Sequence, residues 1–244
     1  MRSWNRNKEN IVAMVPARKG STRLTMKNLA LLNGKPLIFY AIQAAREANI
    51  FSRIVVNSED RIFKKIAERY EVNFYKRPPE LATSETKSDS VVYDFLKKCP
   101  CDILVWVNPT SPLQTGEEIK RIVNYFLKEK LDSLITVKEE SVHCMYQGKP
   151  INFKFEMVFA QTQNLIPVTP FVYSVMIWRS DLFIKTFETK GHAFFCGKVG
   201  YYPVHKLSSI MIKRKEDLML AEGVLKVQSK QKEFEVSYDE IIHE

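Results

Sequence analysis

The sequence predicts an α/β protein with a mostly parallel β-sheet covered by helices on both faces. Strand-like and helix-like segments alternate five times over the first 138 residues, which is typical of such sheets. The run Ile103–Val107 is apolar throughout, as expected of a buried parallel strand. The chain has 244 residues, of which 45% are hydrophobic; this is enough for one sizeable core and too short for two full domains. We therefore expect a single domain over residues 1–244.

The individual elements follow from the spacing of apolar residues and from capping signals. Ser88 and Thr115 are each placed to cap a helix, because their hydroxyls accept hydrogen bonds from N–H groups of the first turn. The predicted strands cover residues 10–15, 54–57, 72–75, 103–107, 134–137 and 171–178. The predicted helices cover residues 36–48 and 61–70, the segments that follow Ser88 and Thr115, and residues 216–227.

The pattern changes between residues 139 and 170. This segment alternates weakly between polar and apolar residues and contains few helix signals. We interpret it as an inserted β-rich arm or a subunit interface.

The net charge of +9 has two interpretations, nucleic-acid binding or a site for small polyanions. No RNA-binding aromatic motif or zinc-finger spacing is present, so we expect no nucleic-acid partner. The longest apolar stretch falls short of a membrane span, and the N-terminal residues lack the apolar core of a secretion signal. The expectation is a cytoplasmic protein without a membrane partner.

The cysteines and histidines indicate neither disulfides nor a metal site. Cys99 and Cys101 are one residue apart, which is too close for the usual zinc knuckle, and two further cysteines are isolated. The four histidines are scattered without metal-ligand spacing. We expect reduced thiols and no metal ligands among these residues.

Residues 16–28, directly after the first predicted strand, form the strongest candidate site. Gly20 and Ser21 allow a tight turn with exposed N–H groups. Ligands of parallel sheets bind beyond the carboxyl ends of the strands, so this loop is placed to hold phosphates. Neither G-x-x-x-x-G-K-[ST] nor G-x-G-x-x-G occurs, so the loop is of another type; its alternative interpretation is a solvated basic loop. The segment contains four cations and no acidic residue: Arg18, Lys19, Arg23 and Lys27.

Two further segments are candidates for nucleotide contacts. Arg77 precedes two prolines, which stiffen its backbone and suit a side chain aimed at a ligand, although a plain proline turn explains the same residues. Residues 107–113 place short polar side chains between prolines at the end of a buried strand, a suitable position to contact a base or ribose.

Together, in this order, the three segments resemble the N-acylneuraminate cytidylyltransferase family, the CMP-sialic acid synthetases and relatives acting on other nonulosonic acids. That family carries a PAR-x-GS-x(5)-KN loop, an RP-x-ELA segment and a QPTSPL segment; the counterparts here are PARKGSTRLTMKN, RPPELA and NPTSPL. The resemblance covers residues 10–138 well and resumes weakly at 161–178 and 206–222. It implies a Rossmann-like nucleotide-diphospho-sugar transferase fold and a homodimer with residues 139–170 as a dimerisation or sugar-side insertion.

The resemblance also implies a reaction. The anomeric hydroxyl of a 2-keto-3-deoxy sugar acid attacks the α-phosphate of CTP, which gives a CMP-sugar and pyrophosphate, with Mg²⁺ as the family's cofactor. Arg18 and Lys27 would hold phosphates and supply catalytic charge. The other implied contacts are Gly20 and Ser21 to phosphate, Asn28, Arg77 and Ser88 to cytidine, and Asn108, Thr110 and Ser111 near the nucleotide and the acidic sugar.

The sequence departs from the family pattern at four places. Thr162 stands where the family has the arginine of an Arg-Gln pair at the subunit contact. Asn108 stands where the family has Gln, and Tyr173-Ser174 stand where it has Asn-Gly. In the last segment the family has S-I-D-I-D-x-x-x-D-L, whose first two aspartates hold Mg²⁺, whereas Met211 and Lys213 occupy those positions here. A thioether is a poor ligand for a hard cation and an ammonium cannot be one, so no metal ligand is assigned.

Three hypotheses remain open. The first is an active cytidylyltransferase that holds Mg²⁺ differently or loosely. The second is a nucleotide- or sugar-binding homologue with little or no catalysis. The third is an unrelated basic α/β binding protein.

Overall fold

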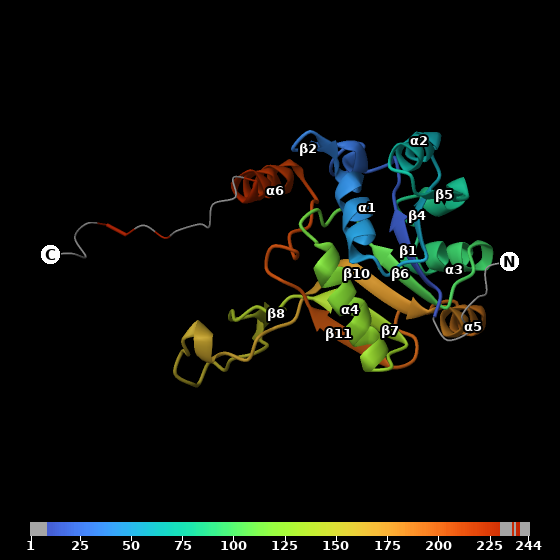
Figure 1. The fold of residues 1–244 in the computed structure, drawn as a ribbon. Helices are drawn as coiled ribbons and strands as arrows, with labels where there is room; N and C mark the ends of the chain where they lie inside the picture. The colour runs from blue at the N-terminus through green and yellow to red at the C-terminus, as the bar shows by residue number, and fades with distance from the viewer. Residues whose placement is uncertain (1–8, 230–235, 237, 240–244) are drawn as a thin grey trace.

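The computed structural model describes residues 9–229, 236, 238 and 239, and within it a seven-stranded sheet forms the centre of the molecule (Figure 1). Strand β10 is antiparallel to both of its neighbours, and every other pairing is parallel. The predicted fold class is confirmed. In spatial order the strands are β11 (Val199–Pro203), β7 (Ser133–Val137), β10 (Phe171–Arg179), β6 (Ile103–Val107), β1 (Ile11–Pro16), β4 (Arg53–Ser58) and β5 (Asn73–Lys76).

Helices cover both faces of this sheet, which explains why all six residues of β1 are buried. One face packs against α1 (Leu37–Ala48), α2 (Arg61–Arg69) and α4 (Gly116–Lys128) in the largest apolar cluster. The other face packs against α3 (Ser88–Lys98) and α5 (Ser180–Lys190).

One of the two predicted caps is confirmed and the other is wrong. The Thr115 hydroxyl accepts a hydrogen bond from the Glu118 N–H at 3.2 Å, as expected of an N-cap. Ser88 is instead the first helical residue of α3, because the helix begins one residue earlier than predicted and Lys87 occupies the cap position. Among the strands of the main sheet and the helices that cover it, α5 and β11 were not predicted.

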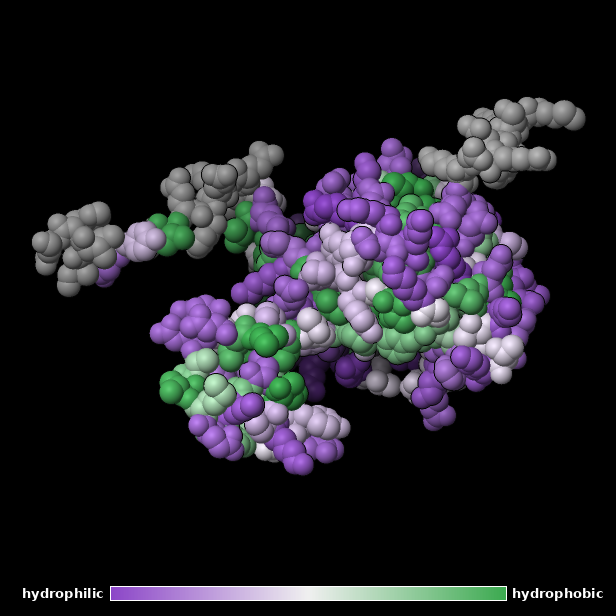
Figure 2. Space-filling model, turned by 90° about the horizontal axis from the view of Figure 1, so that it is seen from below, coloured by the Kyte–Doolittle hydropathy of each residue, from purple (hydrophilic) through white to green (hydrophobic). Residues whose placement is uncertain are grey.

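The 139–170 insertion, hereafter the arm, contains less β-structure than predicted. Its strands are the short pair β8 (Met145–Tyr146) and β9 (Lys149–Pro150), and one isolated bridge joins Glu140 to Val168. The Gln147-Gly148 turn between the strands has φ values of 49° and 76°, as a tight hairpin requires. In Figure 1 the arm projects from the body at the lower left, and Figure 2 shows apolar residues gathered on it.

The C-terminal part returns to the edge of the sheet where the parallel strands end. Helix α6 (Lys215–Gln228) lies against the small hairpin of β2 (Leu31–Leu32) and β3 (Lys35–Pro36). Ile212 and Ala221 are fully buried there. Within the described part of the chain, none of the helices combines the length and apolar character needed to cross a bilayer. His243 lies outside the described residues.

Candidate functional site

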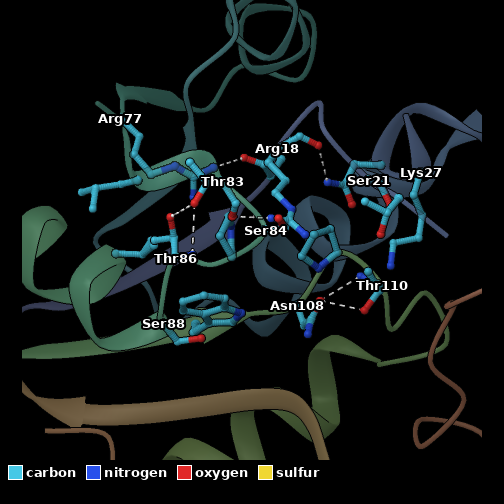
Figure 3. A pocket seen from close by; sticks show the side chains of 18 of the residues that line it. Arg18, Ser21, Lys27, Arg77, Thr83, Ser84, Thr86, Ser88, Asn108 and Thr110 are labelled. Atoms are coloured by element: carbon cyan, nitrogen blue, oxygen red, sulfur yellow. Dashed lines mark hydrogen bonds between the residues drawn. The ribbon is translucent and has the colours of Figure 1, made fainter. Parts of the chain in front are cut away.

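A cavity of about 260 Å³ opens at the carboxyl ends of β1 and β6 (Figure 3). Three chain segments line it: residues 16–28, residues 77–91 and residues 106–110. These are the three segments singled out by the sequence, although they lie far apart along the chain. Eight of the ten predicted site residues line the cavity: Arg18, Ser21, Lys27, Asn28, Arg77, Ser88, Asn108 and Thr110.

The cavity wall contains four cationic side chains and no carboxylate. Lys27 donates from Nζ to the carbonyl of Ile212 at 3.0 Å. Burial lowers the pKa of Lys27, and the nearby charges of Arg23 and Arg18 lower it further. Arg18 donates to the carbonyl of Thr83 at 2.5 Å, so it bridges two of the three lining segments. A concentration of positive charge of this kind is suited to a bound polyanion.

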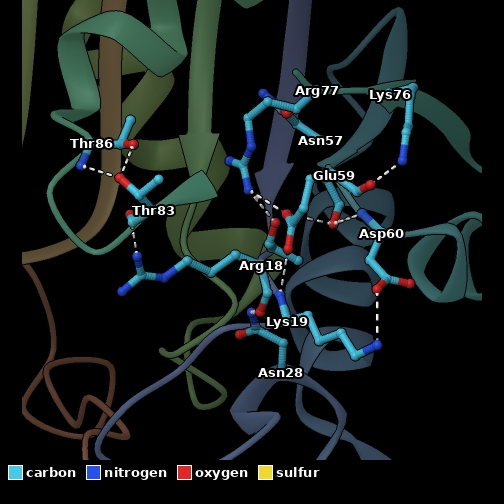
Figure 4. Close-up of polar contacts among 12 residues, drawn as sticks. Arg18, Lys19, Asn28, Asn57, Glu59, Asp60, Lys76, Arg77, Thr83 and Thr86 are labelled. Carbon is cyan, nitrogen blue, oxygen red and sulfur yellow. Dashed lines mark hydrogen bonds and ion pairs between the residues drawn. The ribbon is translucent and has the colours of Figure 1, made fainter. Parts of the chain in front are cut away.

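Arg77 lines the cavity, and one nitrogen of its guanidinium contacts the protein (Figure 4). Nη2 donates to the carbonyl of Ala17 at 2.6 Å and lies 3.0 Å from Glu59 Oε2. The other Glu59 oxygen accepts the N–H of Lys19 at 2.8 Å. The pair therefore fastens the start of the basic loop to the ends of β4 and β5. The expectation that Arg77 also contacts a ligand stays a prediction, since the residue lines the cavity and its Nε has no partner among the described residues.

Asn108 holds the turn after β6. Its backbone N–H donates to the carbonyl of Ser174 at 2.9 Å, and its Nδ2 donates to the carbonyl of Tyr173 at 3.1 Å. Its Oδ1 accepts both the N–H and the hydroxyl of Thr110, at 3.0 and 2.8 Å. The amide thus fixes Thr110 at the cavity wall.

Three lining residues present buried polar atoms that have no partner among the described residues, and the Nε of Arg77 is one of these atoms. The other two belong to Asn28 and Trp106. Asn28 is 6% exposed and donates to the carbonyl of Arg18 at 3.4 Å, while its Oδ1 accepts nothing. The indole N–H of Trp106 is likewise unpaired. Because buried polar groups are normally hydrogen-bonded, these atoms are candidates for contacts with a ligand or water.

Gly20 and Ser111 are the predicted site residues that do not line the cavity. Gly20 has open space around it, so a side chain would meet nothing there. Ser111 is buried behind the wall, with its hydroxyl unpaired among the described residues. The N–H of Ser21, expected to be exposed for phosphate, donates to the carbonyl of Lys19 at 3.0 Å.

Sequence reasoning missed several lining residues in the 83–86 turn. Thr83 and Thr86 form a hydroxyl pair at 2.8 Å, and Ser84 lies beside them at the cavity (Figure 3). Three short hydroxyl residues in a loop look the same in sequence as any solvated turn. The single available signal was their position directly after the RPPELA segment.

The segment at the family's metal positions lies beside this cavity. The N–H of Ile212 donates to the carbonyl of Thr110 at 2.7 Å. Met211 is half-buried and packs against the main apolar cluster, and Lys213 is exposed. Among the described residues, no three His, Cys, Asp or Glu side chains come together as a metal site would require. The donor set does not fit the Mg²⁺ that the resemblance implies.

Comparison with known proteins now decides the family, because a family model described as cytidylyltransferase matches residues 12–238. The chain belongs to the cytidylyltransferase family. An N-acylneuraminate cytidylyltransferase of Streptococcus agalactiae serotype V is 31% identical over 135 residues, which cover 54% of this chain and 33% of the relative. A CMP-N,N'-diacetyllegionaminic acid synthase of Legionella pneumophila is 35% identical over 119 residues, which cover 46% of this chain and 51% of the relative.

The alignments thus span about a third to a half of these cytidylyltransferases. A solved structure of a CMP:2-keto-3-deoxy-manno-octonic acid synthetase complexed with CTP superimposes with a TM-score of 0.68 at 12% identity, covering 89% of this chain and 99% of that one. A 4-diphosphocytidyl-2C-methyl-D-erythritol synthase from Anaerococcus prevotii gives a TM-score of 0.62 at 14% identity, covering 89% and 99%. At such identities the likeness establishes the nucleotide-sugar transferase fold.

Proposed function

We propose that this chain couples CTP to a nonulosonic, sialic-acid-like sugar to give a CMP-sugar and pyrophosphate, in the cytoplasm. The observation that carries the proposal is the cavity itself: Arg18, Arg23 and Lys27 line it without any carboxylate, at the carboxyl ends of parallel strands. Such a wall favours a triphosphate. Relatives named for sialic and legionaminic acid support an acidic nine-carbon sugar as the acceptor.

The proposed step is a substitution at phosphorus. The anomeric oxygen of the sugar forms a bond to the α-phosphorus of CTP while the bond to the β-phosphate oxygen breaks, and the hydroxyl proton passes to solvent. Negative charge builds up on the phosphoryl oxygens and on the departing pyrophosphate. Arg18 and Lys27, fixed before the reaction by Thr83 and Ile212, would stabilise that charge.

Cytidine would be held on the other side of the cavity. The unpaired Oδ1 of Asn28 is an acceptor suited to the exocyclic amino group of cytosine. Ser88 and the 83–86 turn add hydroxyl groups. Asn108 and Thr110 would meet the nucleotide and sugar.

A second candidate is a binding protein that takes CTP or a sugar with little catalysis. The specific observation in its favour is the segment with Met211 and Lys213, which offers no carboxylate to a metal. This alternative shares the cavity with the first and differs in turnover alone.

The deciding experiment measures pyrophosphate release from CTP with a panel of nonulosonic acids, alongside CTP binding by calorimetry. The first candidate requires turnover with at least one sugar, abolished by Arg18→Ala. CTP binding without turnover would select the second candidate. Absence of CTP binding and of turnover under all conditions would eliminate both.

We further propose that the arm docks onto a second copy of the chain to form a homodimer. Val158, Phe159 and Ile166 are 95%, 74% and 79% exposed, an apolar grouping that a monomer rarely leaves in water. Light scattering should give twice the chain mass. A Val158→Asp, Phe159→Asp variant should be monomeric, whereas a dimer that survives this variant would place the interface elsewhere.

A further inference from the structure

We infer that the ammonium group of Lys213 takes the place of a divalent cation at the triphosphate, so that this protein binds metal-free CTP in preference to its Mg²⁺ complex. The inference rests on the proposed function, since it assumes that CTP occupies the cavity. It concerns how the charge of the triphosphate is balanced.

The first step is the position of Lys213. Ile212 is held on both sides by residues that line the cavity: its N–H donates to the Thr110 carbonyl at 2.7 Å, and its carbonyl accepts from Lys27 Nζ at 3.0 Å. Residues 211–213 therefore cross directly beside the cavity, between Lys27 and Thr110. The charge of Lys213 lowers the pKa of Lys27, by less than burial and the charges of Arg23 and Arg18 do, while Asp217 raises it.

The second step is the shortage of oxygen ligands at this place. Met211 packs on the apolar core, which removes its side chain from the cavity. The nearest acid is Asp217, whose Oδ2 accepts the N–H groups of Lys213 and Arg214, both at 2.8 Å, at the start of α6. That carboxylate serves as a helix cap. Mg²⁺ needs near-octahedral oxygen coordination, and no carboxylate of the cavity wall is available to provide it.

The third step is the supply of positive charge. Of the four cations in the wall, Arg77 is neutralised by its ion pair with Glu59. Lys213 adds a charge at the margin to the three that remain, Arg18, Arg23 and Lys27. Lys213 is exposed, and no hydrogen bond or ion pair of its ammonium group occurs within the described residues. A lysine head on a flexible four-carbon stem is therefore free to turn onto a phosphate. Four cations match the charge of the CTP tetraanion, whereas Mg²⁺ bound to CTP would cancel half of that charge before binding.

The test is CTP binding to the full chain by calorimetry, in EDTA and in excess Mg²⁺. We expect binding in EDTA, weakened about three- to tenfold by Mg²⁺ because two ligand charges are lost. Lys213→Ala should weaken binding in EDTA by about tenfold, the loss of one charge-assisted contact. Lys215→Ala removes the same charge from the first turn of α6 and is the matched control, with little expected change.

A reverse substitution sharpens the test. The double variant Met211→Asp, Lys213→Asp should bind CTP more weakly in EDTA and regain affinity when Mg²⁺ is added. Tighter binding of wild-type protein in Mg²⁺ than in EDTA, or equal affinities of Lys213→Ala and Lys215→Ala, would overturn the inference while leaving the proposed function intact. Absence of CTP binding in both solutions would overturn the two together.

Discussion

The Arg77 guanidinium lies 3.0 Å from the Glu59 carboxylate, and the two side chains are 5% and 15% exposed. Through this pair, the ends of β4 and β5 hold the backbone of the basic loop at Ala17 and Lys19. The ion pair is thus part of the framework of the cavity, and its integrity should govern the stability of the loop (Figure 4).

Arg77→Ala should destabilise the protein by about 3 kcal/mol, because it leaves the largely buried Glu59 carboxylate without its ion-pair partner and removes the hydrogen bond to the Ala17 carbonyl. Urea unfolding measures this difference. The matched control is Lys64→Ala, which breaks the exposed Lys64–Glu68 pair and should change stability by less than about 0.5 kcal/mol. Equal effects of the two variants would show that the Arg77 pair does not support the loop.

Lys27→Met should weaken CTP binding by at least about tenfold without lowering the melting temperature of the free protein. The lowered pKa of Lys27 means that its environment, through burial and the charges of Arg23 and Arg18, disfavours the ammonium form. Removing that charge removes an unfavourable interaction from the free protein, whereas the complex loses an attraction to the phosphates. A fall in both affinity and melting temperature would assign Lys27 a mainly structural role.

Binding of CTP should take up protons at alkaline pH. The pKa of Lys27 in the free protein lies below its ordinary value of 10.5, and a bound polyanion should raise it, since the anion favours the charged form. Affinity should therefore be full below the lowered pKa of the free protein and fall as pH rises through it. Calorimetry in buffers of different ionisation enthalpy measures the uptake, which Lys27→Met should abolish.

The Cys101 and Cys196 thiols should resist alkylation in the folded protein at pH 7. Burial is the main cause that raises the pKa of each to about 11, so the thiolate fraction at pH 7 is about one in ten thousand. Mass spectrometry after brief iodoacetamide treatment, with and without urea, measures this. Rapid labelling of either cysteine in native protein would contradict the burial described here.

Substitution by alanine should have opposite effects on stability at Gly116 and at Gly223. A Cβ at Gly116 would lie 2.7 Å from the Ala48 N and 2.8 Å from the Ala44 carbonyl oxygen, so Gly116→Ala would push α4 off the backbone of α1. It should cost about 1–3 kcal/mol. Gly223 lies inside α6 with open space around it, and Gly223→Ala should stabilise by about 0.5–1 kcal/mol. Thermal unfolding of both variants tests the packing of α1 on α4.

The sequence was sufficient to predict the strands and helices that have a clear local pattern of apolar residues. Strand β10 was predicted to within one residue, whereas helix α5 was missed, because Arg179 passes into Ser180 with neither glycine nor proline at the junction. Strand β11 reads Val-Gly-Tyr-Tyr-Pro, lies at the sheet edge and is only partly buried, so its pattern resembles a loop. Its pairing with β7 is a tertiary contact with no local signal.

The same distinction applies to the site. The order of basic, proline-rich and hydroxyl segments predicted which parts of the chain come together. The direction of Arg77 depends on Glu59, which lies in the loop after β4 and belongs to no recognisable motif. The 83–86 turn depends on the contact between Arg18 and the Thr83 carbonyl. Side-chain orientation follows from such distant contacts, which local spacing does not encode.

The reversed direction of β10 has a mechanical consequence. The strand begins where the arm ends, at the edge of the sheet where β1 and β6 finish. Within its first four residues, the carbonyls of Tyr173 and Ser174 accept hydrogen bonds from Asn108. Tyr173 holds a left-handed φ of 59° at this point, a conformation that a tyrosine adopts at a cost. The arm and the cavity are therefore joined through residues 171–174. If docking of the arm changes the affinity of the cavity for a ligand, thermodynamic linkage requires that the bound ligand changes the affinity of docking by the same factor.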